Sequence, residues 1–245
     1  RLLLQRFNFL NSLSFKIIIL FAILPVLSLN VYSRTAGSGF AGPGTNGIFP
    51  TTDPAQLLSE YVQIPSVSGQ EKEAGQFLES FCRDNGLHIH VFTDKEDSYN
   101  FTASLYPLDL GKPNIVLQTH IDVVPTGDAD CWTYPPFSGK IADGMVWGRG
   151  AIDNKALGVM QVLAVLEFVE AARETDFPYN VSVLALSGEE TGGDMGARII
   201  AGEYLEELNP VVVYGEGGAA ITGLLPSRPE MPVFGIEVAQ KRRMF

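Results

Sequence analysis

Cysteine and positive charge are both scarce in this chain of 245 residues. Its two cysteines, Cys82 and Cys131, could form one disulfide, and the sequence leaves open whether they pair. Two cysteines are too few for a disulfide framework or a zinc motif. Lysine and arginine number 17 against 28 acidic residues, and the net charge is -11. Because no basic stripe with interleaved aromatic residues is present, we expect no nucleic-acid partner. Such a balance commonly reflects an acidic surface, and it also suits a protein that holds divalent cations.

Residues 1–33 predict a targeting segment. Three basic residues precede an apolar run at 17–29, which is shorter than the roughly 20 apolar residues of a membrane span and suits a signal peptide. Two interpretations stay open: a signal peptide cleaved before Arg34, and an uncleaved signal-anchor that would attach the chain to a membrane. Both predict entry into the secretory pathway, with a protein that is secreted or held in a vacuolar or lysosomal lumen.

Two sequons agree weakly with this route. They are Asn100-Phe101-Thr102 and Asn180-Val181-Ser182, and both match the acceptor pattern for N-glycosylation. The second lies at the start of an expected strand, where burial would prevent modification.

A flexible linker is predicted at residues 34–52, where glycine and proline recur. The folded domain is expected to span residues 53–245. It begins at Asp53-Pro54, which suits a helix N-cap followed by proline at the first helical position. Hydrophobic residues make up 46% of the chain, which is enough for a sizeable core.

Apolar strands alternate with helical segments and predict an α/β fold, with a mixed, mostly parallel sheet flanked by helices. The expected helices span 54–62, 71–85, 153–173, 191–200 and 203–208. The expected strands span 87–93, 100–106, 114–118, 179–186, 211–214 and 233–239, with a short hairpin at 141–147.

The strand at 114–118 ends in the stretch that first indicates chemistry, Thr119-His120-Ile121-Asp122. His120 and Asp122 are two residues apart and share a face at the carboxyl edge of the sheet, where α/β proteins bind ligands. Our hypothesis is that His120 ligates a metal and that Asp122 orients it. Taken alone, such a pair is more often a histidine that is simply hydrogen-bonded at a strand end.

A glycine-rich stretch, Gly148-Arg149-Gly150, precedes a further acidic residue, Asp153. The glycines permit close backbone approach and unusual φ angles. Asp153 begins the expected helix at 153–173, so it suits a helix N-cap, a metal ligand, or both.

Acidic residues also follow two later strands. Glu189 and Glu190 come after the strand at 179–186, and Glu216 comes after the strand at 211–214. Adjacent side chains project in different directions, so one glutamate of the pair can bind metal while the other faces a substrate. Paired glutamates at a strand end are equally well explained, by themselves, as a solvated acidic turn.

The repetition of strand, acid and glycine favours a common site at the carboxyl edge of one sheet. One histidine with several carboxylates and no cysteine suits zinc, cobalt or manganese in a hydrolytic site. His88 and His90 also share a strand face, but no further ligand follows at suitable spacing. We expect those two to lie on an exposed face.

The ordered motifs resemble those of the dinuclear zinc peptidase family of aminoacylase, carboxypeptidase S and the desuccinylases. The motifs are His120-x-Asp122, Gly148-Arg149-Gly150-x-x-Asp153-x-Lys155, Glu189-Glu190 and Glu216-Gly217-Gly218. The loop at 132–139 and the Glu-Gly-Gly ending look most like the carboxypeptidase S branch, which includes secreted N-acyl amino acid hydrolases. The resemblance implies a zinc-exopeptidase-like catalytic domain that cleaves an amide bond of peptides or N-acyl amino acids with water activated by two Zn²⁺ ions, which Co²⁺ or Mn²⁺ could replace.

The resemblance also implies a role for each site residue. The family's metal ligands fall on His120, Asp153, Glu190 and Glu216. His120 and Glu216 would bind separate ions, and Asp153 would bridge them. Glu189 matches the catalytic general base, and Asp122 matches the carboxylate that orients the metal-bound histidine.

Two departures from the family stand out. Gly215 occupies a position where relatives often have aspartate beside the Glu-Gly-Gly motif. The family also continues well past this length, with a lid and dimerisation domain and a late histidine for the second metal. We therefore expect the N-terminal part of a longer enzyme, and the resemblance implies that the full-length protein forms a homodimer. Two rival interpretations are an inactive fragment or binding module on the same fold, and a dinuclear phosphoesterase, which would need more histidine and asparagine ligands.

Overall fold

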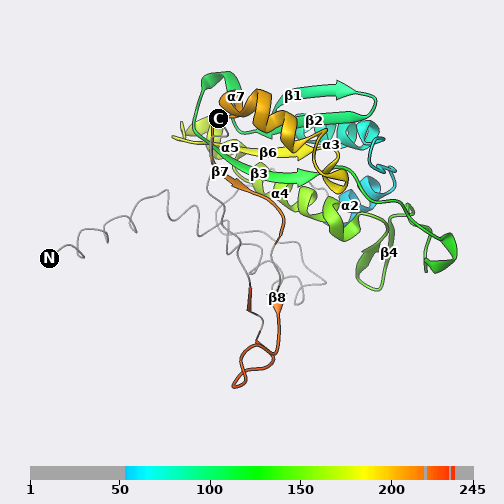
Figure 1. Ribbon diagram of the computed structural model, residues 1–245. Helices are drawn as coiled ribbons and strands as arrows, with labels where there is room; N and C mark the ends of the chain where they lie inside the picture. The colour runs from blue at the N-terminus through cyan, green and yellow to red at the C-terminus, as the bar shows by residue number, and fades with distance from the viewer. Residues whose placement is uncertain (1–52, 218–219, 232, 235–245) are drawn as a thin grey trace. The chain divides into compact units, whose positions relative to one another are not determined.

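The computed structural model describes residues 53–217, 220–231 and 233–234 (Figure 1). The targeting segment and the linker predicted at residues 1–52 lie outside this range, as does most of the strand predicted at 233–239. Among the described residues, no helix combines the length and the apolar character needed to cross a bilayer.

A five-stranded mixed sheet lies at the centre of the described part (Figure 1). In spatial order its strands are β1 (His88–Lys95), β2 (Ser98–Ser104), β6 (Asn180–Leu186), β3 (Asn114–His120) and β7 (Pro210–Tyr214). β3 pairs in parallel with β6 and β7, whereas β2 pairs antiparallel with β1 and β6. Every strand of this sheet except β2 therefore runs in one direction, which confirms the predicted mixed, mostly parallel sheet.

Helices cover both faces of the sheet (Figure 1). The main ones are α2 (Pro54–Val62), α3 (Lys72–Asp84), α4 (Ala156–Leu166), α5 (Val169–Glu174) and α7 (Leu205–Leu208). Gly158 brings α4 against β3, since a Cβ atom there would lie 3.0 Å from the Thr119 Oγ1 atom. On the opposite face, the buried Leu208 of α7 joins a core cluster with Val116 of β3 and Leu184 of β6. Both faces of the central strands are thus buried, as expected for parallel strands between helices.

Smaller elements connect these layers. They are the 3₁₀ turns η2 (Leu108–Leu110), η3 (Ala129–Cys131) and η5 (Glu189–Thr191), the π-helical turns η4 (Ala151–Lys155) and η6 (Ile200–Tyr204), α6 (Ala197–Ile199), and the strand pairs β4 (Lys140–Ala142) with β5 (Met145–Trp147) and β8 (Ala220–Ile221) with β9 (Val233–Phe234). The predicted hairpin at 141–147 is confirmed. Its two turn residues, Asp143 and Gly144, have φ of 54° and 73°, which suits a tight hairpin turn.

Two predicted helices are interrupted. The helix predicted at 153–173 is divided between η4, α4 and α5. Asp153 has non-helical φ and ψ within η4, and the N–H of Phe168 bonds the Val165 carbonyl, which tightens the end of α4 before α5. The helix predicted at 191–200 forms only from residue 197. Gly192 and Gly193 have φ of 100° and 77°, and this left-handed backbone ends η5 before α6 begins.

Both sequon asparagines are buried inside the fold, with exposed fractions of 0% for Asn100 and 1% for Asn180. The Asn100 Nδ2 atom donates to the Met195 carbonyl at 2.8 Å, and the Asn180 Nδ2 atom donates to the Tyr106 carbonyl at 2.8 Å. A glycan on either nitrogen would displace these bonds and could not fit within the core. The expectation that the protein is a glycoprotein at these sequons is therefore wrong for the folded domain.

The two cysteines are both free thiols and do not pair. Cys82 on α3 is buried, with an exposed fraction of 0%, whereas Cys131 in η3 is exposed. Burial also raises the pKa of the Cys82 thiol, which disfavours the reactive thiolate.

We therefore expect a water-soluble thiol reagent to titrate one thiol per native chain, and both thiols after denaturation. Absorbance of the released thiolate measures the count. Cys131→Ser should abolish the native reaction and leave the reaction of the denatured chain at one thiol. Two fast-reacting thiols in the native wild-type chain would contradict the burial of Cys82.

Candidate metal centre

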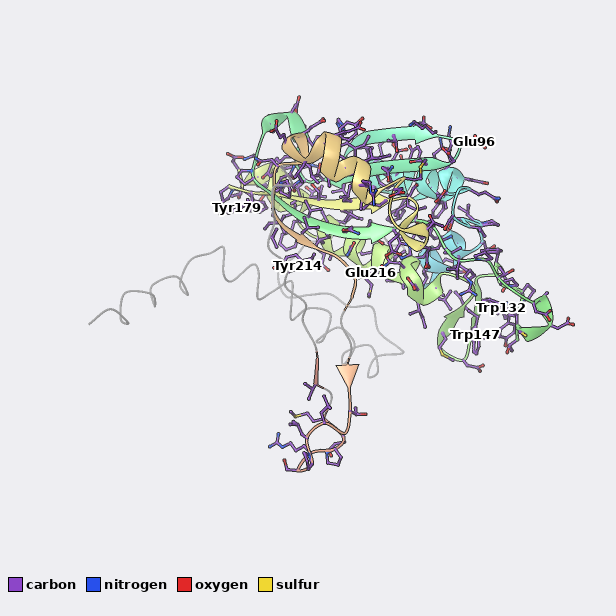
Figure 2. The ribbon with its side chains drawn as sticks, in the orientation of Figure 1. Glu96, Trp132, Trp147, Tyr179, Tyr214 and Glu216 are labelled. Carbon is purple, nitrogen blue, oxygen red and sulfur yellow. The ribbon has the colours of Figure 1, made fainter. Side chains whose placement is uncertain are left out.

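The predicted site residues converge because the parallel strands end at the same edge of the sheet. His120 at the end of β3 pairs in register with Leu186 at the end of β6. Leu117 of β3 pairs with Tyr214 at the end of β7. Residues that follow β6 and β7 therefore reach the level of His120, and Figure 2 shows Glu216 just beyond β7.

His120 has a defined orientation. Its side chain is buried, and its Nδ1 atom lies 2.9 Å from the backbone carbonyl oxygen of Asp122 and 3.5 Å from the Asp122 Oδ1 atom. A carbonyl oxygen can only accept, so Nδ1 carries the hydrogen and the neutral ring has its lone pair on Nε2. The nitrogen able to bind a metal is thus Nε2.

Three carboxylates face that Nε2 atom. The distances are 3.0 Å to Asp153 Oδ1, 3.4 Å to Glu216 Oε2 and 3.9 Å to Glu189 Oε2. Ligand atoms of His120, Asp153 and Glu216 all lie within 4.8 Å of one another. A lone pair surrounded by carboxylates is electrostatically unfavourable without a cation between them, so this donor set fits a divalent metal ion.

The protonation of His120 shows the same electrostatic demand. Burial by itself would lower the pKa of His120, but the hydrogen bond to Asp122 and the charges of Glu216 and Asp122 outweigh burial and raise the pKa to about 9. In a metal-free chain near neutral pH, a proton therefore supplies the positive charge that the carboxylates require.

Asp153 reaches the site from an irregular backbone. Its φ and ψ of -113° and 95° are not helical, and the Asp153–Asn154 peptide bond is cis. Because α4 begins only at Ala156, Asp153 is not the helix N-cap that the sequence suggested. Its carboxylate, largely exposed, points to His120 instead.

The remaining motif residues fix this backbone. Gly150 has φ of 83°, and a Cβ atom there would lie 2.5 Å from Val123 Cγ1, so the predicted close approach is confirmed. Lys155 is fully buried, and its Nζ atom donates to the carbonyl oxygens of Tyr61 and Ile64 at 2.9 and 2.7 Å. Burial lowers the pKa of Lys155 to about 7. Lys155 thus ties the turn that bears Asp153 to the end of α2.

Asp122 is the most heavily bonded acid of the site. Its carboxylate is completely buried and accepts from the Ser68 hydroxyl at 2.7 Å and from the backbone N–H groups of Glu189 and Glu190 at 3.0 and 3.2 Å. Burial would raise its pKa, but the bonds from His120, Ser68 and Glu189 lower it. Asp122 therefore remains ionised and joins β3 to the turn after β6.

Glu189 and Glu190 lie side by side in η5, directly after β6. Burial, together with nearby carboxylates such as Asp153, raises the pKa of both glutamates, while His120 acts in the opposite direction. The Glu189 Oε2 atom lies 3.9 Å from His120 Nε2. In the described residues, the ligand atoms that lie close together come from His120, Asp153 and Glu216, and Glu190 is not among them. The structure thus brings Glu189 to the predicted place, and the ligand role of Glu190 stays a prediction.

Two contributors were missed in the sequence. Ser68 holds Asp122, and Asn154 accepts from the Thr119 hydroxyl and donates to the Glu216 carboxylate. Asn154 thereby supplies polar support for Glu216 where Gly215 has no side chain. Its place directly after Asp153 was the available signal.

His88 and His90 lie apart from this centre, as predicted. His88 is exposed on β1, and the His90 Nε2 atom pairs with Glu207 Oε1 at 3.1 Å. The loop at 132–139 contacts α2, since the Ser59 hydroxyl donates to the Gly139 carbonyl at 2.6 Å, and it contacts the glycine-rich stretch, since the Arg149 N–H donates to the Pro136 carbonyl at 2.7 Å. Trp132 lies under the Arg149 guanidinium at 5.1 Å, and Figure 2 shows Trp132 and Trp147 in the same projecting segment.

Comparison with known proteins places these observations in a family context. The model of peptidase family M20/M25/M40 matches residues 116–239. The succinyl-diaminopimelate desuccinylase of Ehrlichia canis is 36% identical over 142 residues, which cover 57% of this chain and 36% of that protein. The enzyme of the same name from Rhodopseudomonas palustris is 29% identical over 186 residues, covering 69% of this chain and 48% of the relative. The chain thus spans less than half the length of these relatives.

Solved structures with the same fold include an M20 family metallo-carboxypeptidase of Sulfolobus solfataricus. Its TM-score is 0.58 at 22% identity, over 70% of this chain and 38% of that structure. Human carnosine dipeptidase 1 has a TM-score of 0.54 at 24% identity, over 69% of this chain and 40% of that structure. At these identities the likeness concerns the fold, and it agrees with the α/β architecture described above.

The comparisons contradict the predicted localisation and confirm the predicted family, but not the predicted branch of that family. The secretory localisation, with a secreted, vacuolar or lysosomal protein, is contradicted because the curated relatives are bacterial desuccinylases. That prediction depended on the composition of an apolar run and on two sequons, whose asparagines are buried. The family inferred from the motifs is confirmed, but these relatives are desuccinylases and do not single out the carboxypeptidase S branch.

We predict that Asp122→Asn weakens both the fold and the metal centre. The new amide nitrogen would oppose a backbone N–H of the Glu189–Glu190 turn, and one lost bond to a charged group in a buried site costs about 2–3 kcal/mol. Loss of a group that orients a metal-bound histidine typically lowers metal affinity by about 10- to 100-fold. Urea unfolding and zinc competition with a chromophoric chelator measure the two effects. Asp128→Asn, at an exposed aspartate, is the control, and equal behaviour of both variants would refute the assignment.

Proposed function

Since the chain belongs to peptidase family M20/M25/M40, we propose that it is the catalytic part of a zinc-dependent hydrolase that cleaves an amide bond of a peptide or an N-acyl amino acid. The observation that carries this proposal is the environment of His120. Its Nε2 lone pair faces the carboxylates of Asp153 and Glu216, and the glutamate proposed as general base lies 3.9 Å away.

The proposed zinc ligands are His120, Asp153, Glu190 and Glu216. Imidazole and carboxylate donors without cysteine are typical of hydrolytic zinc sites, whereas structural zinc sites are rich in cysteine. The donor set therefore supports a catalytic zinc site over a structural one. We propose that these residues would hold two ions, as the family resemblance implies. Zinc bound here would polarise the carbonyl of the amide and lower the pKa of a water molecule.

Glu189 is proposed as the general base. Its side chain is 43% exposed and that of Asp153 is 67% exposed, so this side of the centre, here called its open side, is accessible to solvent and would admit a substrate. Burial and the neighbouring carboxylates raise its pKa, which improves its ability to take a proton near neutral pH and to return it to the leaving amine. Asp122 holds the backbone of Glu189 and the ring of His120 and so keeps base and ligand in register.

The substrate class follows from what the relatives' names have in common. A desuccinylase removes an acyl group from an amino acid, and a carboxypeptidase or dipeptidase cleaves a peptide, so each acts on an amide attached to an amino acid. We propose this shared class for the present chain without choosing among its members.

A second candidate is a metal-binding module without turnover. It is supported by the ligand count, since the three donors that meet in the described residues include a single histidine. This candidate predicts metal binding without hydrolysis, so turnover by the chain separates the two.

We predict that Glu189→Gln lowers kcat by a factor of roughly 10² to 10⁴, because an amide cannot accept the proton that a carboxylate can. Zinc content, measured by atomic emission on the purified chain, should remain near the wild-type value. The exposed Glu203→Gln is a matched control and should retain wild-type turnover. Persisting activity in Glu189→Gln would show that another group is the base.

Removal of metal should abolish turnover and should also reduce stability. A bound ion stabilises the native state because it binds there better than to the unfolded chain. Dialysis against a chelator is therefore expected to lower the melting temperature, and added Zn²⁺ should restore both turnover and melting temperature. A chain whose melting temperature is indifferent to chelator and to Zn²⁺ would argue against a metal centre altogether.

A further inference from the structure

The turn that carries Glu189 and Glu190 has a distinctive hydrogen-bond pattern. Each backbone N–H from residue 187 to residue 190 donates to a side-chain oxygen that comes from another part of the fold. Asp122 accepts the last two, as described above. The first two go to Asn100 and Glu71, neither of which belongs to the proposed ligand set. A turn fixed at four successive amides holds its side chains within narrow limits.

Asn100 on β2 bonds both ends of the loop from residue 187 to residue 196. Its Oδ1 atom accepts from the Ser187 N–H at 2.8 Å, and its Nδ2 atom donates to the Met195 carbonyl at 2.8 Å. The two ends also touch directly, since a Cβ atom at Gly196 would lie 2.2 Å from the Ser187 carbonyl oxygen. The loop from 187 to 196 is therefore closed on itself, and Asn100 bridges its two ends.

Glu71, the residue before α3, is an acid with no exposure to solvent. Its Oε1 atom accepts from the Gly188 N–H at 3.2 Å, whereas its Oε2 atom has no hydrogen-bond partner within the described part of the chain. Burying a carboxyl group costs free energy, and backbone N–H groups of Gly69, of Glu71 itself and of Gly188 offset part of this cost. Its hydrogen bond to the turn gives it a specific purpose.

We infer that Asn100 and Glu71 are positioning residues, which set the places of Glu189 and Glu190 by holding the backbone N–H groups of Ser187 and Gly188. Their side chains bond the backbone of the turn at Ser187 and Gly188, and Asn100 also bonds Thr93, Ser98 and the Met195 carbonyl. The consequence for catalysis rests on the proposed function, whereas the consequence for the turn does not.

The test compares Asn100→Leu and Glu71→Met with Asn114→Leu in the full chain. Asn114 is an equally buried asparagine at the opposite end of β3, where its side chain bonds the Leu208 carbonyl and the Ser182 hydroxyl. All three changes remove buried hydrogen bonds, but only the first two reach the turn. Glu71→Gln keeps an oxygen for the Gly188 N–H and serves as the conservative rescue.

The first measurement is amide hydrogen exchange of residues 187–191 without added metal. Loss of one hydrogen bond at the turn should speed exchange there by about tenfold in Asn100→Leu and Glu71→Met. Exchange of this segment should stay at the wild-type rate in Asn114→Leu and Glu71→Gln. If Asn100→Leu does not fold, Glu71→Met carries the same comparison. Unchanged exchange in the folded positioning variants, or equal acceleration in Asn114→Leu, would overturn the inference.

The second measurement concerns the centre itself. A displaced Glu189–Glu190 turn should lower kcat about 10- to 100-fold with KM changed less than about twofold, and should alter the visible absorption of Co²⁺ added as the sole metal. Asn114→Leu should lose stability without either change. If the wild-type chain neither binds Co²⁺ nor hydrolyses amides, the proposed function fails, and the exchange rates still decide whether Asn100 and Glu71 hold the turn.

Discussion

The buried carboxylate of Asp122 is the constraint on which the centre depends. A charge with no access to solvent is tolerated only when hydrogen bonds replace the lost water, and here they come from His120, Ser68 and the amides of residues 189 and 190. These partners belong to β3, to the loop before α3 and to the turn after β6. Satisfying one charge therefore requires three segments to meet at the carboxyl edge of the sheet. The frame of the site is thus built from hydrogen bonds between side chains and backbone of the chain itself.

At the open side of the centre, by contrast, negative charge is not compensated by hydrogen bonds of this kind. The carbonyl bond at Nδ1 turns the His120 lone pair toward Asp153 and Glu216, so negative charge gathers around a nitrogen without its own hydrogen. A proton on His120 neutralises part of this negative charge, and its raised pKa reflects that effect. A divalent cation would neutralise more of it, because it can contact all three donors at once. The buried and the open carboxylates thus have distinct physical roles, one in holding backbone and the others in attracting positive charge.

Sequence patterns located much of this arrangement because strand ends and acids are local features. The positions of His120 and Glu216 follow from apolar runs whose ends can be read residue by residue, and parallel pairing then brings those ends together. The supporting contacts could not be found in that way, since Glu71 lies 117 residues from the amide it holds and Asn100 lies 87 residues from its own. The start predicted for the helix at 191–200 was wrong for a local reason, because Gly192 and Gly193 have positive φ angles that a helix does not allow.

Asn100 shows why a short motif can mislead about both location and role. The triplet that begins with it satisfies the pattern for N-glycosylation, a modification that needs an accessible amide nitrogen. In the fold that nitrogen donates to Thr93, Ser98 and the Met195 carbonyl, and the amide oxygen accepts from the Ser187 N–H in the turn that carries Glu189 and Glu190. The two uses exclude each other, because a glycan on Nδ2 would remove the donor that closes the loop. A three-residue motif does not show whether its asparagine is buried. Because Asn100 is buried, its side chain supports the turn and is not accessible to modification.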